Sequence, residues 1–285
     1  MSTRAVGVRG AAWMVLPALV PTVVVLGVGV GAAAAQSLGV LPLIGDAELS
    51  LDAYRQLVSD AAVPAGLVVS LAIATASTAI ALVLGGATAL LVQRSRVGGR
   101  VLAAVAAATI PIPHLVGAAA VGLLLADSGL VARLVGAQPG TFPALVGGPW
   151  WVAVVVEFAW KESAFVAVVV LGSLAASERA LDEAAAGLGA GPWQRVRRVT
   201  LPLAAPALVV SGTIAFAYVV GSYEVAWLLG RSHPEPLPVL AFRMFSDTDL
   251  AMRPTALAVA MLTIGVASIT LALGASALRR VVVIR

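Results

Sequence analysis

The stretch Asp182–Pro202 reads DEAAAGLGAGPWQRVRRVTLP, and its composition differs from that of the sequence on either side. It follows the apolar run VVVLGSLAAS and precedes the apolar run LAAPALVVSGTIAFAYVVG. Alanine, glutamate, glutamine and arginine favour helix, whereas the glycines interrupt it. The chain therefore places a charged segment of interrupted helix between two runs that suit a lipid environment.

The overall composition indicates a membrane protein. Of the 285 residues, 60% are hydrophobic and 11% are charged, and the mean hydropathy is +1.02. Soluble domains carry about a quarter charged residues. The net charge of +4 does not indicate nucleic-acid binding, because the basic residues form no dense patch and are not interleaved with aromatic ones. The chain has no cysteine, which excludes disulfides and thiolate metal sites.

Hydropathy predicts an all-α membrane protein with a single domain, residues 1–285, and six transmembrane helices. A helix needs about 20 apolar residues to cross a bilayer, and six segments meet that requirement: 11–33, 64–92, 101–125, 150–173, 207–230 and 255–278. The first is preceded by two arginines and so resembles a secretory signal, but it exceeds the roughly 7–15 apolar residues of such signals. We therefore expect it to be retained as a helix.

The arginines predict the orientation, because basic residues concentrate on the cytoplasmic side of a membrane. With the N-terminus inside, the single lysine lies within a span and most arginines are cytoplasmic. The outer segments hold only Arg55, Arg133, Arg231, Arg243 and Arg253. Both termini and the stretch Asp182–Pro202 are therefore predicted to be cytoplasmic.

Two outer loops have predictable structure. Residues 49–60 favour a short helix on the outer surface, since Ser50 can cap it and its apolar residues share one face. Residues 231–254 are expected to be largely irregular, because four prolines interrupt any helix or strand there.

Within Asp182–Pro202 the residues predict a helix, a turn and a second helix. The glycines break the first helix, and Pro192 can begin the second because its missing N–H is not needed at that position. Leu201 and Pro202 are expected to end the second helix. That helix carries an apolar stripe at three-residue spacing: Trp193, Val196 and Val199. The stripe must be buried against a partner surface.

These residues resemble the EAA loop of permease subunits of binding-protein-dependent ABC importers. Glu183-Ala184-Ala185, three residues, Gly189, nine residues, Val199, one residue and Leu201-Pro202 match its spacing, although the family usually has isoleucine where Val199 stands. The position between the fourth and fifth of six spans also fits. Upstream, WKESAF (160–165) is similar to the family's pattern in the preceding helix.

The resemblance implies a type I ABC importer permease fold in the plasma (inner) membrane of a prokaryote. It implies ABC ATPase subunits, a second permease subunit and an extracytoplasmic solute-binding protein as partners. The loop, residues 177–206, would dock on the ATPase and transmit its closure to the spans. The ATPase-coupling residues implied are Glu183, Ala184, Ala185, Gly189, Trp193, Val199, Leu201 and Pro202.

We expect no enzymatic activity and no cofactor in this chain. It has no G-x-x-x-x-G-K-[ST] phosphate loop, so ATP and magnesium would be bound by the partner ATPase. No H-E-x-x-H or G-x-S-x-G motif is present, and the only histidines, His114 and His233, are far apart. His114, in IPIPH, is expected to be an interior histidine without a special role.

Charged residues inside spans are the remaining candidates, because they are costly in lipid and usually line a pathway or pair with each other. Glu157 and Lys161 are spaced for an ion pair within one helix. Glu162 points about 100° away from Lys161, toward a neighbouring helix or the pore. Further along, Ser222, Tyr223 and Glu224 either line the translocation path or pack against the companion subunit.

The substrate is less well indicated. Leu188-Gly189-Ala190 resembles the branch for polyamines, ferric iron, thiamine and oxyanions, and residues 221–254 resemble spermidine/putrescine-type permeases. A polyamine or similar organic cation is therefore expected, with thiamine, ferric iron and phosphonate as alternatives. An ion-coupled secondary transporter is a rival class, but the sequence lacks the paired broken helices of such proteins. A membrane scaffold without transport would leave the loop unexplained.

Overall fold

The computed structural model describes residues 8–95, 98–138, 140–175 and 178–283, and every regular element in those ranges is helical. The α-helices, in chain order, are α1 (Val8–Ser37), α2 (Asp52–Ser59), α3 (Ala62–Arg94), α4 (Gly98–Thr109), α5 (His114–Leu125), α6 (Leu130–Leu134), α7 (Val152–Leu174), α8 (Glu178–Gly187), α9 (Pro192–Arg195), α10 (Leu201–Gly221), α11 (Glu224–Leu229), α12 (Leu237–Phe245) and α13 (Arg253–Val283). A π-helical turn, Val196–Thr200, joins α9 to α10, and a 3-10 turn, Leu250–Met252, precedes α13. The all-α prediction is confirmed.

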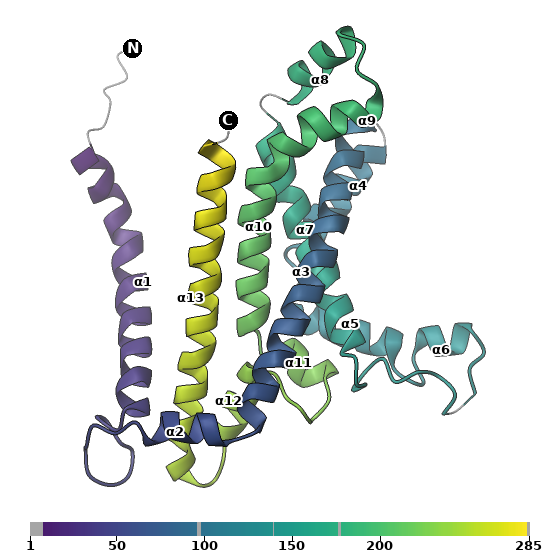
Figure 1. Ribbon diagram of the computed structural model, residues 1–285. Coiled ribbons are helices and arrows are strands. Elements are labelled where there is room, and N and C mark those ends of the chain that lie inside the picture. Colours follow the sequence, from purple (N-terminus) through teal and green to yellow (C-terminus); the bar gives the residue numbers. More distant parts are fainter. Residues whose placement is uncertain (1–7, 96–97, 139, 176–177, 284–285) are drawn as a thin grey trace.

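The long helices run side by side, and the short ones gather at their two ends (Figure 1). The start of α1, the end of α13 and the α8–α9 segment lie at one end of the molecule, whereas α2 and α12 lie at the other. Helix α1 lies outermost, beyond α13, and its side chains from Met14 to Gly31 are exposed. The N- and C-termini were predicted to be cytoplasmic. Residues 1–7 and 284–285 at those termini lie outside the described residues, as does residue 177, the first of the predicted loop 177–206.

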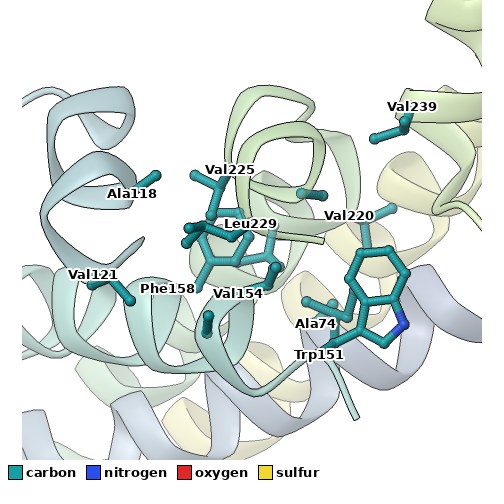
Figure 2. Close-up of a cluster of buried hydrophobic side chains, with 14 residues drawn as sticks. Ala74, Ala118, Val121, Trp151, Val154, Phe158, Val220, Val225, Leu229 and Val239 are labelled. Carbon is teal, nitrogen blue, oxygen red and sulfur yellow. The ribbon is translucent and has the colours of Figure 1, made fainter. Parts of the chain in front are cut away.

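Helix α7 forms the centre of the core. In Figure 2 its Val154 and Phe158 meet Val225 and Leu229 of α11, with Val121 of α5 close by. Glycine allows α3 to approach α7 closely, because a Cβ added at Gly85 would lie 2.6 Å from the carbonyl oxygen of Ser163. Small residues at such contacts are typical of helices packed within a membrane.

Five described helices are long and apolar enough to cross a membrane: Met14–Ser37, Ala62–Arg94, His114–Leu134, Pro192–Gly221 and Leu250–Val282. Three of them contain the predicted spans 11–33, 64–92 and 255–278 almost entirely. The predicted span 150–173 corresponds to α7, which has 23 residues. Helix α7 is long enough to cross but carries three charged side chains: Glu157, Lys161 and Glu162.

Two predicted spans are each divided into two helices. The segment 101–125 is interrupted between Thr109, the end of α4, and His114, the start of α5. Pro111 and Pro113 lie in the interruption, and proline cannot donate the helical N–H bond. The segment 207–230 is interrupted between α10 and α11 at Ser222, whose backbone is extended. Hydropathy did not indicate these interruptions because the residues around them remain apolar.

At the end opposite α8, the short helix predicted within 49–60 is present, although its N-cap is Leu51 and not Ser50, and the prediction for 231–254 is wrong. The outer location of the short helix stays a prediction. Helix α2 lies within the predicted 49–60 segment, with Ala53 and Leu57 buried. The segment 231–254, predicted to be irregular, contains the nine-residue helix α12. Its prolines begin the helix, since Pro236 is the N-cap and Pro238 lies in the first turn, where a missing N–H is tolerated.

Candidate functional site

The first region of interest is the loop formed by α8 and α9. Helix α8 ends in a Schellman motif, in which the Gly189 N–H donates to Ala186 O and the Ala190 N–H donates to Ala185 O, both at 3.0 Å. Gly189 has a φ of +83°, a conformation that favours glycine. The glycine at this point of the motif and the alanines before it therefore produce the sharp turn from α8 toward α9.

Polar contacts fix the two helices of the loop. Arg195 Nη1 lies 2.6 Å from Asp182 Oδ2, which ties α9 to α8. Arg94, at the end of α3, donates to the carbonyl oxygen of Pro192 at 3.2 Å. No role was predicted for Asp182 or Arg195, although their opposite charges on facing helices were a signal for this pair. The loop is therefore held as a defined shape on the end of the bundle.

The predicted apolar stripe does not form a single face. Val196 is 8% exposed and Val199 is half-buried, whereas Trp193 is 73% exposed. The physical reason is the π-helical turn after α9, whose wider winding takes side chains at three-residue spacing off a common face. Val196 is thus already buried within this chain, and the burial of the remaining stripe against a partner stays a prediction.

The end of the loop also differs from the prediction. Leu201 and Pro202 do not end the second helix, because α9, the π-helical turn and α10 follow one another without an interruption from Pro192 to Gly221. Within an α-helix the proline ring meets the carbonyl four residues earlier. The wider turn before Pro202 relieves that contact, and Leu201 donates instead to Val196 O, five residues back.

An apolar surface remains on the outside of the loop. Leu188, at the turn, is 90% exposed, and Trp193 on α9 and Leu181 on α8 are also exposed. Among the other predicted coupling residues, Glu183 and Ala184 are exposed and Ala185 is half-buried. An exposed tryptophan and leucine on an ordered loop are typical of a surface that binds another protein.

The second region is the set of charges on α7. Glu157, Lys161 and Glu162 are all buried. Lys161 does not form the predicted ion pair with Glu157: within the described ranges, no carboxylate oxygen lies within 4.0 Å of its ammonium group. Its Nζ instead donates to backbone carbonyl oxygens in the α4–α5 interruption: Thr109 at 2.8 Å, Ile110 at 3.4 Å and Ile112.

The interruption explains this change of partner. The carbonyls at the end of α4 lack the N–H donors of a continuing helix because prolines follow, and Thr109 O accepts one longer backbone bond, from the Ile112 N–H at 3.3 Å. An unpaired carbonyl in apolar surroundings costs several kcal/mol. An ammonium group has three N–H donors, and Lys161 directs all of them to this one segment. The helix end, which is also the negative end of the α4 dipole, therefore binds the lysine.

Glu157 lies at the other side of the interruption. One of its carboxylate oxygens is 3.1 Å from His114 Nδ1, and a Cβ added at Gly117 would lie 2.8 Å from the same oxygen. Both residues belong to the first turn of α5, the positive end of that helix dipole. Glu162 Oε1 lies 3.7 Å from His114 Nε2. His114, expected to be an interior histidine without a special role, thus faces two buried carboxylates.

The remaining predicted pathway residues lie around the second interruption. Ser222 is buried, and Tyr223 packs on Phe242 with ring centroids 4.4 Å apart. Tyr218, one turn earlier on α10, contacts His114 with ring centroids 4.9 Å apart. Sequence reasoning missed Tyr218. His114 thus lies between Glu162 and Tyr218, and the place of Glu162 and Ser222–Glu224 on a translocation path stays a prediction.

Metal binding receives no support from the described part of the chain, in which no group of three or more histidine, aspartate or glutamate side chains could hold an ion. The geometry instead consists of an exposed apolar loop at one end and charged residues around interrupted helices inside.

Comparison with known proteins identifies this arrangement. The family described as "Binding-protein-dependent transport system inner membrane component" matches residues 81–285. The chain belongs to this family. It is therefore a multi-pass membrane permease of the type I ABC importer class, a transport component and not a catalytic subunit.

Curated relatives in the family differ in the solute that they are named for. A probable molybdenum ABC transporter permease of Haloferax volcanii is 30% identical over 233 residues, 80% of each chain. The molybdenum transport system permease ModB of Azotobacter vinelandii is 28% identical over 192 residues, 65% of this chain and 80% of the relative. The putrescine transport system permease PotI of Escherichia coli is 31% identical over 107 residues, 38% and 37% of the two chains.

Solved structures show the same fold at lower identity. A bacterial alginate ABC transporter in complex with an alginate-bound periplasmic protein gives a TM-score of 0.73 at 19% identity and covers 95% of this chain and 96% of its own. The methionine transporter MetNI, in an inward-facing conformation, gives 0.59 at 22% identity and covers 82% and 99%. The helical arrangement is therefore that of an importer permease.

Proposed function

We propose that this permease imports its solute with energy from a separate ATPase that binds the α8–α9 loop. The observation that carries the proposal is the exposed apolar surface at Leu188 and Trp193, on a loop that polar contacts hold in shape. ATP binding would draw two ATPase subunits together, and their closure would move the loop and the helices attached to it. The spans would then open outward to receive solute from an extracytoplasmic binding protein, beside a second permease subunit.

The proposed topology has six crossings: α1, α3, α4–α5, α7, α10–α11 and α13. It is supported by the position of the α8–α9 loop at the same end as the start of α1 and the end of α13 (Figure 1). With that end in the cytoplasm, α2 and α12 face outward. Helix α7 then crosses despite its charges, because Lys161 and Glu157 find partners within the protein.

For the solute we propose a polyamine or a similar organic cation. The resemblance of residues 221–254 to polyamine permeases and the partial match to the putrescine permease PotI support this class. Two molybdenum permeases match over more of the chain, and they favour an oxyanion such as molybdate as the second candidate. Thermal-shift screening of the cognate binding protein separates the candidates, because a stabilising shift with molybdate and none with putrescine would reject the cation.

The coupling role is tested with two matched double variants. Glu183→Ala with Gly189→Ala alters the loop, whereas Glu48→Ala with Gly45→Ala makes the same changes at the opposite end. Both glycines have positive φ (+83° and +90°) and open space around them, and both glutamates are exposed, so the conformational cost is similar. We expect only the first pair to lose ATPase copurification and transport-coupled ATP hydrolysis. If the Glu183→Ala, Gly189→Ala variant still copurifies with the ATPase and still couples ATP hydrolysis to transport, the proposal is wrong.

A further inference from the structure

Helix α7 joins the two regions, because the chain continues from its end into the loop and its side chains bind the α4–α5 interruption. It ends at Leu174, and α8 begins at Glu178. Lys161 lies about 20 Å from the loop end of α7, at a rise of 1.5 Å per residue. A displacement of the loop that shifts or rotates α7 therefore reaches Lys161 through one continuous helix.

Lys161 holds the α4 side of the interruption with all of its hydrogen-bonding capacity. Its ammonium group has three donors, and the carbonyl oxygens of Thr109, Ile110 and Ile112 accept them. An acceptor that loses this donor must find another partner or remain unpaired at a cost of about 1–3 kcal/mol. The end of α4 therefore follows Lys161 when α7 moves, or it loses its only charged donor within the described residues.

Glu157 contacts the α5 side of the interruption, and its charge is opposite to that of Lys161. It lies one turn before Lys161, about 6 Å along the helix axis, and it contacts His114 and Gly117 in the first turn of α5. The positive side chain thus faces the negative end of α4 and the negative side chain faces the positive end of α5. We call Lys161 and Glu157 the α7 bracket, because the two charges enclose the interruption.

An uninterrupted helix would need none of this chemistry. A continuous α4–α5 span has no orphan carbonyls, and an apolar α7 would be less costly to bury than one with three ionisable side chains. The chain instead combines two prolines in the interruption with opposite charges on the helix that leads to the loop. A polar attachment between a moving helix and an interrupted one can transmit a conformational change.

We propose that the α7 bracket couples movement of the α8–α9 loop to rearrangement of the α4–α5 interruption, which makes Lys161 and Glu157 coupling residues inside the membrane. This inference rests on the proposed function, because it requires an ATPase that moves the loop. It adds a site of transmission that lies far from the docking surface.

The chain contains no cysteine, so single cysteines can report on each region. Ile110→Cys, at a side chain that is 46% exposed, reports on the interruption, and Leu188→Cys reports on the loop. Each is placed in the permease reconstituted with its copurifying ATPase in nanodiscs, and maleimide labelling is timed with and without a non-hydrolysable ATP analogue. We expect the ATPase to protect Leu188→Cys, and the nucleotide to change labelling of Ile110→Cys by about tenfold.

Lys161→Gln, which removes the charge and one donor, should abolish the nucleotide response at Ile110→Cys and leave protection of Leu188→Cys intact. The matched control is Val168→Gln, at an exposed position of the same helix, and it should leave both signals unchanged. An unchanged response in Lys161→Gln overturns the inference, and so does a lost response in Val168→Gln or an absent response in the parent chain.

If Lys161→Gln fails to assemble, Glu157→Gln is used, because glutamine has nearly the same shape and lacks the charge. The bracket predicts a lost response in this variant too, and a response equal to that of the parent chain overturns the inference. Failure of the proposed function has a different signature: Leu188→Cys in the parent chain would label equally fast with and without the ATPase.

Discussion

The α8–α9 loop and the buried face of α7 both differ from an apolar transmembrane helix, but their side chains find partners in opposite ways. On the loop, Trp193 and Leu188 remain exposed although the backbone around them is well fixed. On α7, Lys161 directs its three donors to one segment of the same chain. Lys161 thus finds its partners within one subunit, whereas the loop presents a surface suited to another. Substitutions in the two regions should therefore affect different properties.

The largest effect on stability is expected for Lys161→Met. Methionine fills similar space but removes the ammonium donor of three carbonyl oxygens, and each buried acceptor left without a donor costs about 1–3 kcal/mol. Thermal unfolding in detergent should show a large decrease in Tm. Val168→Met, at an exposed position on the same helix, should change the Tm little. Equal melting temperatures for the two variants would mean that the lysine does not stabilise the interruption.

A smaller effect is expected for Gly117→Ala. The added Cβ would lie 2.8 Å from the Glu157 carboxylate and 3.3 Å from the Trp160 ring, so α5 must move away from α7. Overpacking of this kind costs about 1–3 kcal/mol. Gly172→Ala, on α7 with open space around it, should be neutral or slightly stabilising. The comparison of their unfolding temperatures checks the close approach, and a stabilising Gly117→Ala would contradict it.

The same contrast explains what the sequence could predict. The helix–turn–helix of the loop depends on neighbouring residues, so Gly189 and Pro192 indicated it directly, and the Schellman motif and the start of α9 confirm it. The partners of Lys161 come from another helix about 50 residues earlier. Spacing along one helix suggested only Glu157, because local patterns contain no information on which carbonyls a distant interruption leaves unpaired.

Prolines illustrate a second limit. Pro111 and Pro113 lie in an interruption, Pro236 and Pro238 begin a helix, and Pro206 lies inside one. Whether proline ends a helix depends on whether its missing N–H falls in the first turn and on whether the preceding turn can widen. A cluster of prolines predicts irregular structure, which was wrong for α12, and the proline pattern does not indicate the π-helical turn before Pro202.

The smallest effect on stability, and the most direct test of the central claim, concerns two exposed tryptophans. Trp193 is on the loop and Trp150, 83% exposed, precedes α7 at its opposite end. Replacing either with alanine should change unfolding of the isolated chain by no more than about 0.5 kcal/mol. Affinity for the ATPase, measured on immobilised permease, should fall about 30-fold for Trp193→Ala, as for a hot-spot residue, and should not change for Trp150→Ala. Equal affinities for both variants would contradict the claim that the α8–α9 loop is where the ATPase binds.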